Sequence, residues 1–151
     1  MAIRVEAAPC RACVGRTAKL PAIIAKILLP MNAAPSTSEL SDAEYRQRTD
    51  ALLSSIEAAA DRWLQADVID IDTHRTGGLL ELSFPNGSKL VVNTQPPLHE
   101  VWLAARAGGF HYRFRAGTWR DTRDDSEFFE ALSRHASNQG GRTLRFEPPA
   151  G

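Results

Sequence analysis

Residues Asn86 to Ala104, NGSKLVVNTQPPLHEVWLA, decide the fold that this sequence predicts. Asn86-Gly87 separates two apolar-patterned runs, and an Asn-Gly pair readily takes the two positive φ angles of a type I′ hairpin turn. The prolines at 96–97 then interrupt the strand ladder, because proline has no N–H to donate. In the strand that follows, alternation places Glu100 and Trp102 on the face opposite the apolar valine and leucine. A large aromatic side chain is therefore expected to face solvent.

Helical patterns lie on both sides of a run of strand patterns. A first helix is predicted from about Ser41, because Ser41 and Glu44 form a capping box ahead of a long apolar stripe. About six short strands follow, and a second helix is predicted from Ser126 to Asn138. Short turns make neighbouring strands antiparallel, and two helices can cover only one sheet face. We therefore expect an α+β two-layer sandwich, with two helices packed on one face of an antiparallel sheet.

The net charge of zero hides a segregation of charge along the chain. Residues 1–30 hold five basic residues against one acid, whereas residues 31–72 hold nine acids against three arginines. The acidic block favours a cationic partner over an anionic one. We expect a flexible basic extension over residues 1–40, with Met31 as an alternative start, a domain over 41–145 and a flexible tail over 146–151.

The two cysteines, Cys10 and Cys13, both lie in the predicted extension. They supply two thiols where a structural zinc site needs four ligands, so they predict no zinc site by themselves. A domain without disulfides is typical of a reducing compartment, which favours the cytoplasm.

Carboxylates recur around the end of the first helix. Asp50, Glu57 and Asp61 share one helical stripe, which calls for nearby arginines such as Arg46 and Arg62 or for a function. Residues 67–72 alternate like a strand, which would place Asp70 and Asp72 on one side, about 7 Å apart. Such carboxylates suit a weak iron, calcium or manganese site, to which His74 could add a nitrogen. The alternative is that acids on an edge strand prevent edge-to-edge pairing.

Several classes of function are excluded by missing motifs. The sequence has no glycine-rich phosphate loop, no nucleophile elbow and no H-x-x-x-H spacing of a helical zinc site. A nucleic-acid platform is disfavoured, because the aromatics of residues 110–115 are predicted to face inward, away from Arg113 and Arg115. An exposed Trp102 instead suggests a protein contact, unless the C-terminal tail covers it.

A family resemblance rests on a long series of motifs. They are Asp70-Ile71-Asp72, Gly77-Gly78, Leu80-x-Leu82-x-Phe84, Asn86-Gly87-Ser88-Lys89, Asn93-x-Gln95-x-Pro97, Leu98-His99-x-Val101-Trp102-Leu103-Ala104, Gly108-Gly109 and the strand around Trp119. From about Ser41 to Gln139 the chain resembles the frataxin family, specifically its bacterial CyaY branch. The sequence departs from the family pattern in two places. One is Ala58–Ala60, where relatives often carry acids, and the other is Glu100, where glutamine is common.

The resemblance implies an iron-binding accessory protein that regulates iron–sulfur cluster assembly and is not an enzyme. Family members bind ferrous and ferric iron weakly, and the matching carboxylates here are Glu57, Asp61, Asp67, Asp70 and Asp72. The same acidic ridge is expected to contact the cysteine desulfurase. The exposed sheet is expected to contact the cluster scaffold protein, through Asn93, Gln95, Trp102 and Glu100.

The resemblance also implies a mainly monomeric protein without nucleic-acid or membrane partners, for which iron-dependent oligomers stay open. Two other functions stay open as well. One is a ferroxidase or iron-storage activity, and the other is a protein adaptor that needs no metal. The substitution of Ala58–Ala60 for acids implies fewer and weaker iron sites, because a hard cation needs several oxygens at once.

Overall fold

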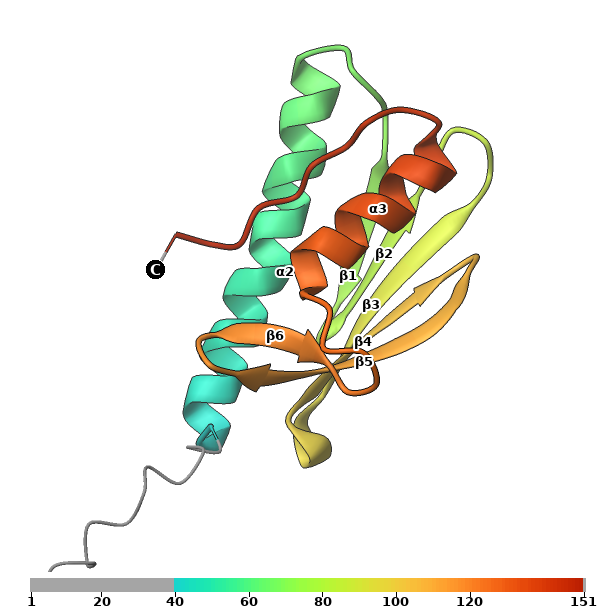
Figure 1. Cartoon of the computed structure of the whole chain (residues 1–151). Helices are drawn as coiled ribbons and strands as arrows, with labels where there is room; N and C mark the ends of the chain where they lie inside the picture. The colour runs from blue at the N-terminus through green and yellow to red at the C-terminus, as the bar shows by residue number, and fades with distance from the viewer. Residues whose placement is uncertain (1–39, 151) are drawn as a thin grey trace, which may run out of the picture. The chain divides into compact units, whose positions relative to one another are not determined.

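The structure, a computed structural model, describes residues 40–150. In chain order its elements are α2 (Asp42–Gln65), β1 (Asp72–Thr76), β2 (Leu79–Ser83), β3 (Lys89–Gln95), η2 (Pro96–Leu98), β4 (Glu100–Ala105), β5 (Gly108–Arg115), β6 (Thr118–Asp121) and α3 (Phe128–Gly140). The strands form one antiparallel sheet in sequential order, β1 to β6. α2 and α3 lie on the same side of this sheet (Figure 1). The predicted α+β sandwich is confirmed, and the described helices leave one sheet face open.

The predictions for the N-terminal extension, including Met31 and the two cysteines, concern residues outside the described range. Within residues 40–150, no helix combines the length and the apolar character that crossing a membrane requires.

The capping box at Ser41 sets the start of α2. The Glu44 backbone N–H donates to Ser41 Oγ at 3.3 Å, and the Ser41 N–H donates to Glu44 Oε2 at 3.0 Å. These two bonds satisfy donors that have no partner inside the helix. The apolar stripe then meets the sheet, where Tyr45, Leu52 and Ile56 are almost fully buried. Because burying a side chain of this size contributes about 1.5–3 kcal/mol, packing is the main force that holds α2.

The hairpin between β2 and β3 is confirmed, but its turn is not the predicted type I′. Gly87 has a positive φ of 79°, whereas Asn86 does not have a positive φ. The Gly87 N–H donates to the Phe84 carbonyl at 2.9 Å, so the turn begins one residue earlier and contains Pro85. Proline holds φ near −65°, which suits the second position of a type I turn. Pro85 therefore decides the turn, and Gly87 closes it.

The segment after α3 belongs to the core, which corrects the prediction of a flexible tail from residue 146. Phe146 is 3% exposed and its ring packs edge-on against Trp63, with centroids 4.8 Å apart. Its N–H donates to Ser133 Oγ at 2.9 Å, and the Leu144 N–H donates to Ser137 Oγ at 2.8 Å. Two serines of α3 thus hold the segment, which runs back toward α2 in Figure 1.

Two buried tyrosines are expected to respond in opposite ways to loss of the hydroxyl. Tyr45 Oη donates to the Glu100 carbonyl at 2.6 Å, whereas Tyr112 Oη has no hydrogen-bond partner among the described residues. Tyr45→Phe should therefore lower the free energy of unfolding by about 1 kcal/mol, and Tyr112→Phe should leave it unchanged or raise it. Urea denaturation of the two variants checks this pair, and equal losses would contradict it.

Candidate functional site

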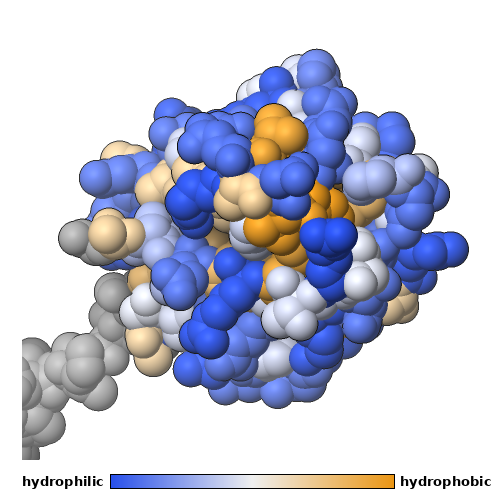
Figure 2. Space-filling model, turned by 90° about the horizontal axis from the view of Figure 1, so that it is seen from above, coloured by the Kyte–Doolittle hydropathy of each residue, from blue (hydrophilic) through white to orange (hydrophobic). Residues whose placement is uncertain are grey.

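The acidic ridge consists of Glu57, Asp61, Asp67, Asp70 and Asp72. Glu57 and Asp61 lie on α2, Asp67 and Asp70 lie in the connection to β1, and Asp72 begins β1. The four aspartates of the ridge are exposed, whereas Glu57 is partly buried. Figure 2 looks down on this end of the molecule and shows an apolar area in the middle of a hydrophilic surface. Leu64, which is 55% exposed, lies at the same end of α2.

The predicted strand over residues 67–72 is wrong in its bounds, because the chain first makes a helix-ending turn. The Val68 N–H donates to the Trp63 carbonyl at 2.8 Å and the Asp67 N–H donates to the Leu64 carbonyl at 3.1 Å. This pair of bonds is the Schellman motif. Asp67 takes the left-handed position with φ of 53°, where glycine is the usual residue and aspartate is tolerated. The alternation of apolar and acidic residues therefore begins in the helix-ending turn, continues through irregular chain over residues 69–71, and reaches β1 only at Asp72.

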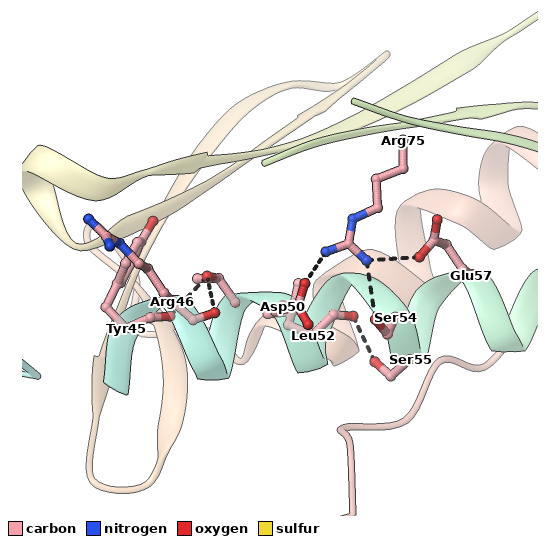
Figure 3. A network of polar contacts seen from close by, with 9 residues as sticks. Tyr45, Arg46, Asp50, Leu52, Ser54, Ser55, Glu57 and Arg75 are labelled. Carbon is pink, nitrogen blue, oxygen red and sulfur yellow. Dashed lines mark hydrogen bonds and ion pairs between the residues drawn. The ribbon is translucent and has the colours of Figure 1, made fainter. Parts of the chain in front are cut away.

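Arg75 of β1 neutralises one ridge carboxylate on α2, that of Glu57, together with the neighbouring Asp50. Its guanidinium contacts Glu57 Oε2 at 3.1 Å, Ser54 Oγ at 3.2 Å and the Asp50 carboxylate (Figure 3). Burial lowers the pKa of Arg75, but its bonds to Glu57 and Asp50 outweigh burial and raise the pKa. Arg75 therefore takes the role that the sequence assigned to Arg46 and Arg62. Of the predicted metal ligands, Glu57 is the one already engaged.

The other four ridge carboxylates have no lysine, arginine or histidine within 4.0 Å in the described part of the chain. They do not converge, however, because no three His, Cys, Asp or Glu side chains among residues 40–150 are grouped to hold a metal ion. His74, which was considered as a nitrogen ligand, lies with its Nε2 3.2 Å from Thr76 Oγ1. The ridge thus offers charge and separate oxygens, and no preformed cage.

The open face is the sheet surface that the described helices do not cover. Strand register places Asn93 beside Trp102, and Trp102 beside His111. The Trp102 and His111 rings are stacked, with centroids 4.3 Å apart and an interplanar angle of 12°. A shallow hollow of about 220 Å³ adjoins this stack, lined also by Leu79 and Val91. Trp102 is partly exposed, as the alternation predicted.

Glu100 is on the predicted face, but it is not exposed. Its side chain is 7% exposed, and it accepts hydrogen bonds from Trp102 Nε1 and from Arg113 Nε, both at 2.8 Å. His111 Nδ1 lies 3.7 Å from the same carboxylate. Burial raises the pKa of Glu100, but the hydrogen bonds outweigh it, so the pKa lies below the ordinary value. The prediction of Glu100 as a partner contact is corrected, since it fixes the neighbouring side chains instead.

Comparison with known proteins identifies the family of this domain. The family model described as a frataxin-like domain matches residues 38–142. The chain belongs to the frataxin family. A protein named iron-sulfur cluster assembly protein CyaY from Polaromonas sp. is 49% identical over 110 residues, which cover 73% of this chain and 95% of that protein. Its namesake from Burkholderia mallei is 50% identical over 107 residues, which cover 71% of this chain and 98% of that protein.

Solved frataxin structures share the fold. Frataxin from Psychromonas ingrahamii matches with a TM-score of 0.63 and 37% identity, over 72% of this chain and 99% of that chain. A trimeric frataxin from Saccharomyces cerevisiae, complexed with ferrous iron, matches with a TM-score of 0.53 and 23% identity, over 77% of this chain and 96% of that chain. The resemblance inferred from the sequence motifs is therefore confirmed.

Sequence patterns missed the contacts of three residues, Arg75, His111 and Arg113, that shape the surfaces of this frataxin-like domain. Arg75 was not expected at the ridge, because 18 and 25 residues separate it from Glu57 and Asp50. His111 and Arg113 were placed on the open face, but their contacts with Glu100 were not foreseen. The alternation of residues 110–115 indicated which side chains share a face. Only the register of β4 with β5 shows that these side chains lie opposite Glu100 and Trp102.

Proposed function

We propose that this chain is an iron-binding accessory protein that regulates iron–sulfur cluster assembly in the cytoplasm. The observation that carries the proposal is the identity of about one half to relatives named for iron–sulfur cluster assembly, across nearly their full lengths. The dispersed carboxylates of the ridge favour an accessory role over a ferroxidase, since a di-iron oxidation centre clusters its carboxylates and histidines in a bundle core.

The ridge is the proposed place for iron. Asp61, Asp67, Asp70 and Asp72 are exposed and have no described cationic partner, so their oxygens are available to a hard cation. Because no three of them converge, each bound ion would complete its coordination mainly with water. Such binding is weak and exchangeable, which suits delivery or sensing of iron. The yeast relative complexed with ferrous iron supports iron binding at family level.

The two surfaces are proposed to serve two protein partners. The ridge would bind a basic surface of the cysteine desulfurase, by an attraction that weakens as salt rises. The open face would bind the scaffold protein through Asn93, Gln95 and Trp102. Iron on the ridge partly cancels its charge, so iron binding and desulfurase binding would be thermodynamically linked.

An anaerobic titration tests the ridge. Asp70→Asn/Asp72→Asn should weaken binding to the cognate desulfurase by about tenfold at low salt, because two charges of the steering surface are removed without a change in shape. Ferrous iron should change the affinity of the wild type and change that of the variant much less. The measurement is isothermal calorimetry with and without iron.

Glu130→Gln/Glu147→Gln is the matched control, since it removes two exposed acids away from the ridge and should leave binding unchanged. Equal affinities of the wild type with and without iron would refute the linkage. If the Asp70/Asp72 variant kept full binding and full regulation in a cluster-reconstitution assay, the adaptor without metal would be favoured. Failure of the wild type to bind either partner would refute the proposed function.

A further inference from the structure

The outer hairpin of the sheet carries a pattern that the fold does not need. Arg113 of β5 and Arg120 of β6 are direct cross-strand partners, and Arg115 lies two residues along β5 on the same side. Side chains that are direct partners point to the same face, and like charges in such positions destabilise a sheet. The register also aligns Arg113 with Glu100, which places all three arginines on the open face. We call Arg113, Arg115 and Arg120 the arginine cluster.

Neighbouring carboxylates neutralise little of this charge. Glu100 contacts only Nε of Arg113, and the Arg113 side chain is still 55% exposed. Among the described residues, no carboxylate lies within 4.0 Å of Arg115 or Arg120. Arg120 Nη1 instead donates to the backbone carbonyl of Asp125 at 3.2 Å. Asp121 is 3% exposed and accepts the backbone N–H of Arg123 at 2.7 Å.

The arginine cluster adjoins the part of the open face around Trp102. Glu100 holds the Trp102 indole and the Arg113 guanidinium at the same time, each at 2.8 Å. The aromatic stack and the nearest arginine are therefore fixed relative to each other. A partner that covers Trp102 would meet guanidinium groups along the β5–β6 side of the contact.

We propose that the protein partner of the open face places an acidic segment on the arginine cluster, beside the Trp102–His111 stack. The inference rests on the proposed function, since it concerns the partner of the same face. Guanidinium groups bind carboxylates through paired N–H donors, and rim charges set the association rate and the specificity of an interface. Glu100 acts as a positioning residue for this contact.

A protein carboxylate fits better than a nucleic-acid phosphate. The face of Trp102 toward His111 is already covered, so it cannot stack a base on that side. Tyr112, the fully buried aromatic of β5, points to the opposite face. At the other edge of the open face lies Asp72, whose carboxylate would repel a continuous phosphate backbone.

The test is binding of the full chain to the cognate scaffold protein at 50 and 300 mM NaCl. Arg115→Glu/Arg120→Glu should weaken binding about tenfold or more at 50 mM, and the difference should shrink at 300 mM. Arg134→Glu on α3 is the matched control, because it reverses one exposed arginine on the helix layer and should stay within twofold of wild type. Thermal melting should show no loss in the double variant, since the Arg113–Arg120 repulsion is relieved.

The outcomes separate this inference from the proposed function. If Trp102→Ala loses binding while the double arginine variant stays within twofold of wild type, the inference is overturned and the proposed function stands. Absence of scaffold binding by the wild type overturns both. A single-stranded oligonucleotide is the second probe: if only its binding depends on Arg115 and Arg120, a phosphate ligand replaces the acidic protein segment and the inference is overturned.

Discussion

Trp102→Ala should weaken binding of the scaffold protein by at least about 30-fold, because a central tryptophan of an interface commonly contributes 2 kcal/mol or more. The structure explains why this tryptophan suits the role. Its ring is stacked on His111 and its indole N–H is held by Glu100, so little conformational freedom remains to be lost on binding. Isothermal calorimetry gives the affinity, and circular dichroism checks that the fold persists.

Two variants control this measurement. Trp102→Phe keeps an aromatic ring but has no N–H for Glu100, so its affinity should fall between those of wild type and Trp102→Ala. Leu98→Ala removes an apolar side chain that is 49% exposed in η2, outside the strands, and it should bind like wild type. Scaffold binding by Trp102→Ala at wild-type affinity would show that the open face is not the contact surface.

The fold followed from local patterns because those patterns report short-range geometry. The capping box of Ser41 and Glu44 predicted the start of α2. The alternation around Trp102 correctly predicted the sheet face on which Trp102 lies. The alternation of residues 67–72 led to a wrong strand prediction for the same reason. Alternation describes which residues are apolar, but the Val68 N–H closes the end of α2 instead of joining a strand. A pattern of side chains does not reveal which backbone group takes the hydrogen bond.

The site was harder to predict, since its important contacts join distant parts of the chain. Periodicity places Glu100 on the open face, but only the register of β4 with β5 brings Arg113 across to cover it. In the same way, the stripe of Asp50 and Glu57 indicated a missing cation, and the identity of Arg75 depends on how β1 lies over α2. Local alternation sets the sheet face on which a residue lies. How deeply the residue is buried and which residue it pairs with depend on distant parts of the chain.

Glu100→Ala is expected to lower the free energy of unfolding by about 1.5–3 kcal/mol, the range for hydrogen bonds to charged groups. The change leaves the Trp102 N–H without its acceptor and Arg113 without its carboxylate. Scaffold binding should also weaken, because the indole is no longer held in place. Urea denaturation measures the stability, and the difference in tryptophan fluorescence between Glu100→Ala and wild type, which share Trp63 and Trp119, reports the altered environment of Trp102.

The pH dependence of the free energy of unfolding distinguishes the effect of the Glu100 charge from the effect of its side-chain packing. The pKa of Glu100 in the folded protein is lowered, so its contribution to stability is present above the unfolded pKa, about 4.3, and is lost as pH falls through the folded pKa. The stability difference between wild type and Glu100→Gln should therefore be largest near pH 7 and should shrink below pH ~4. Glu81→Gln, which breaks the exposed pair with Lys89, is the matched control and should change nothing measurable. A difference for Glu100→Gln that stays constant with pH would show that its charge does not anchor Trp102 and Arg113.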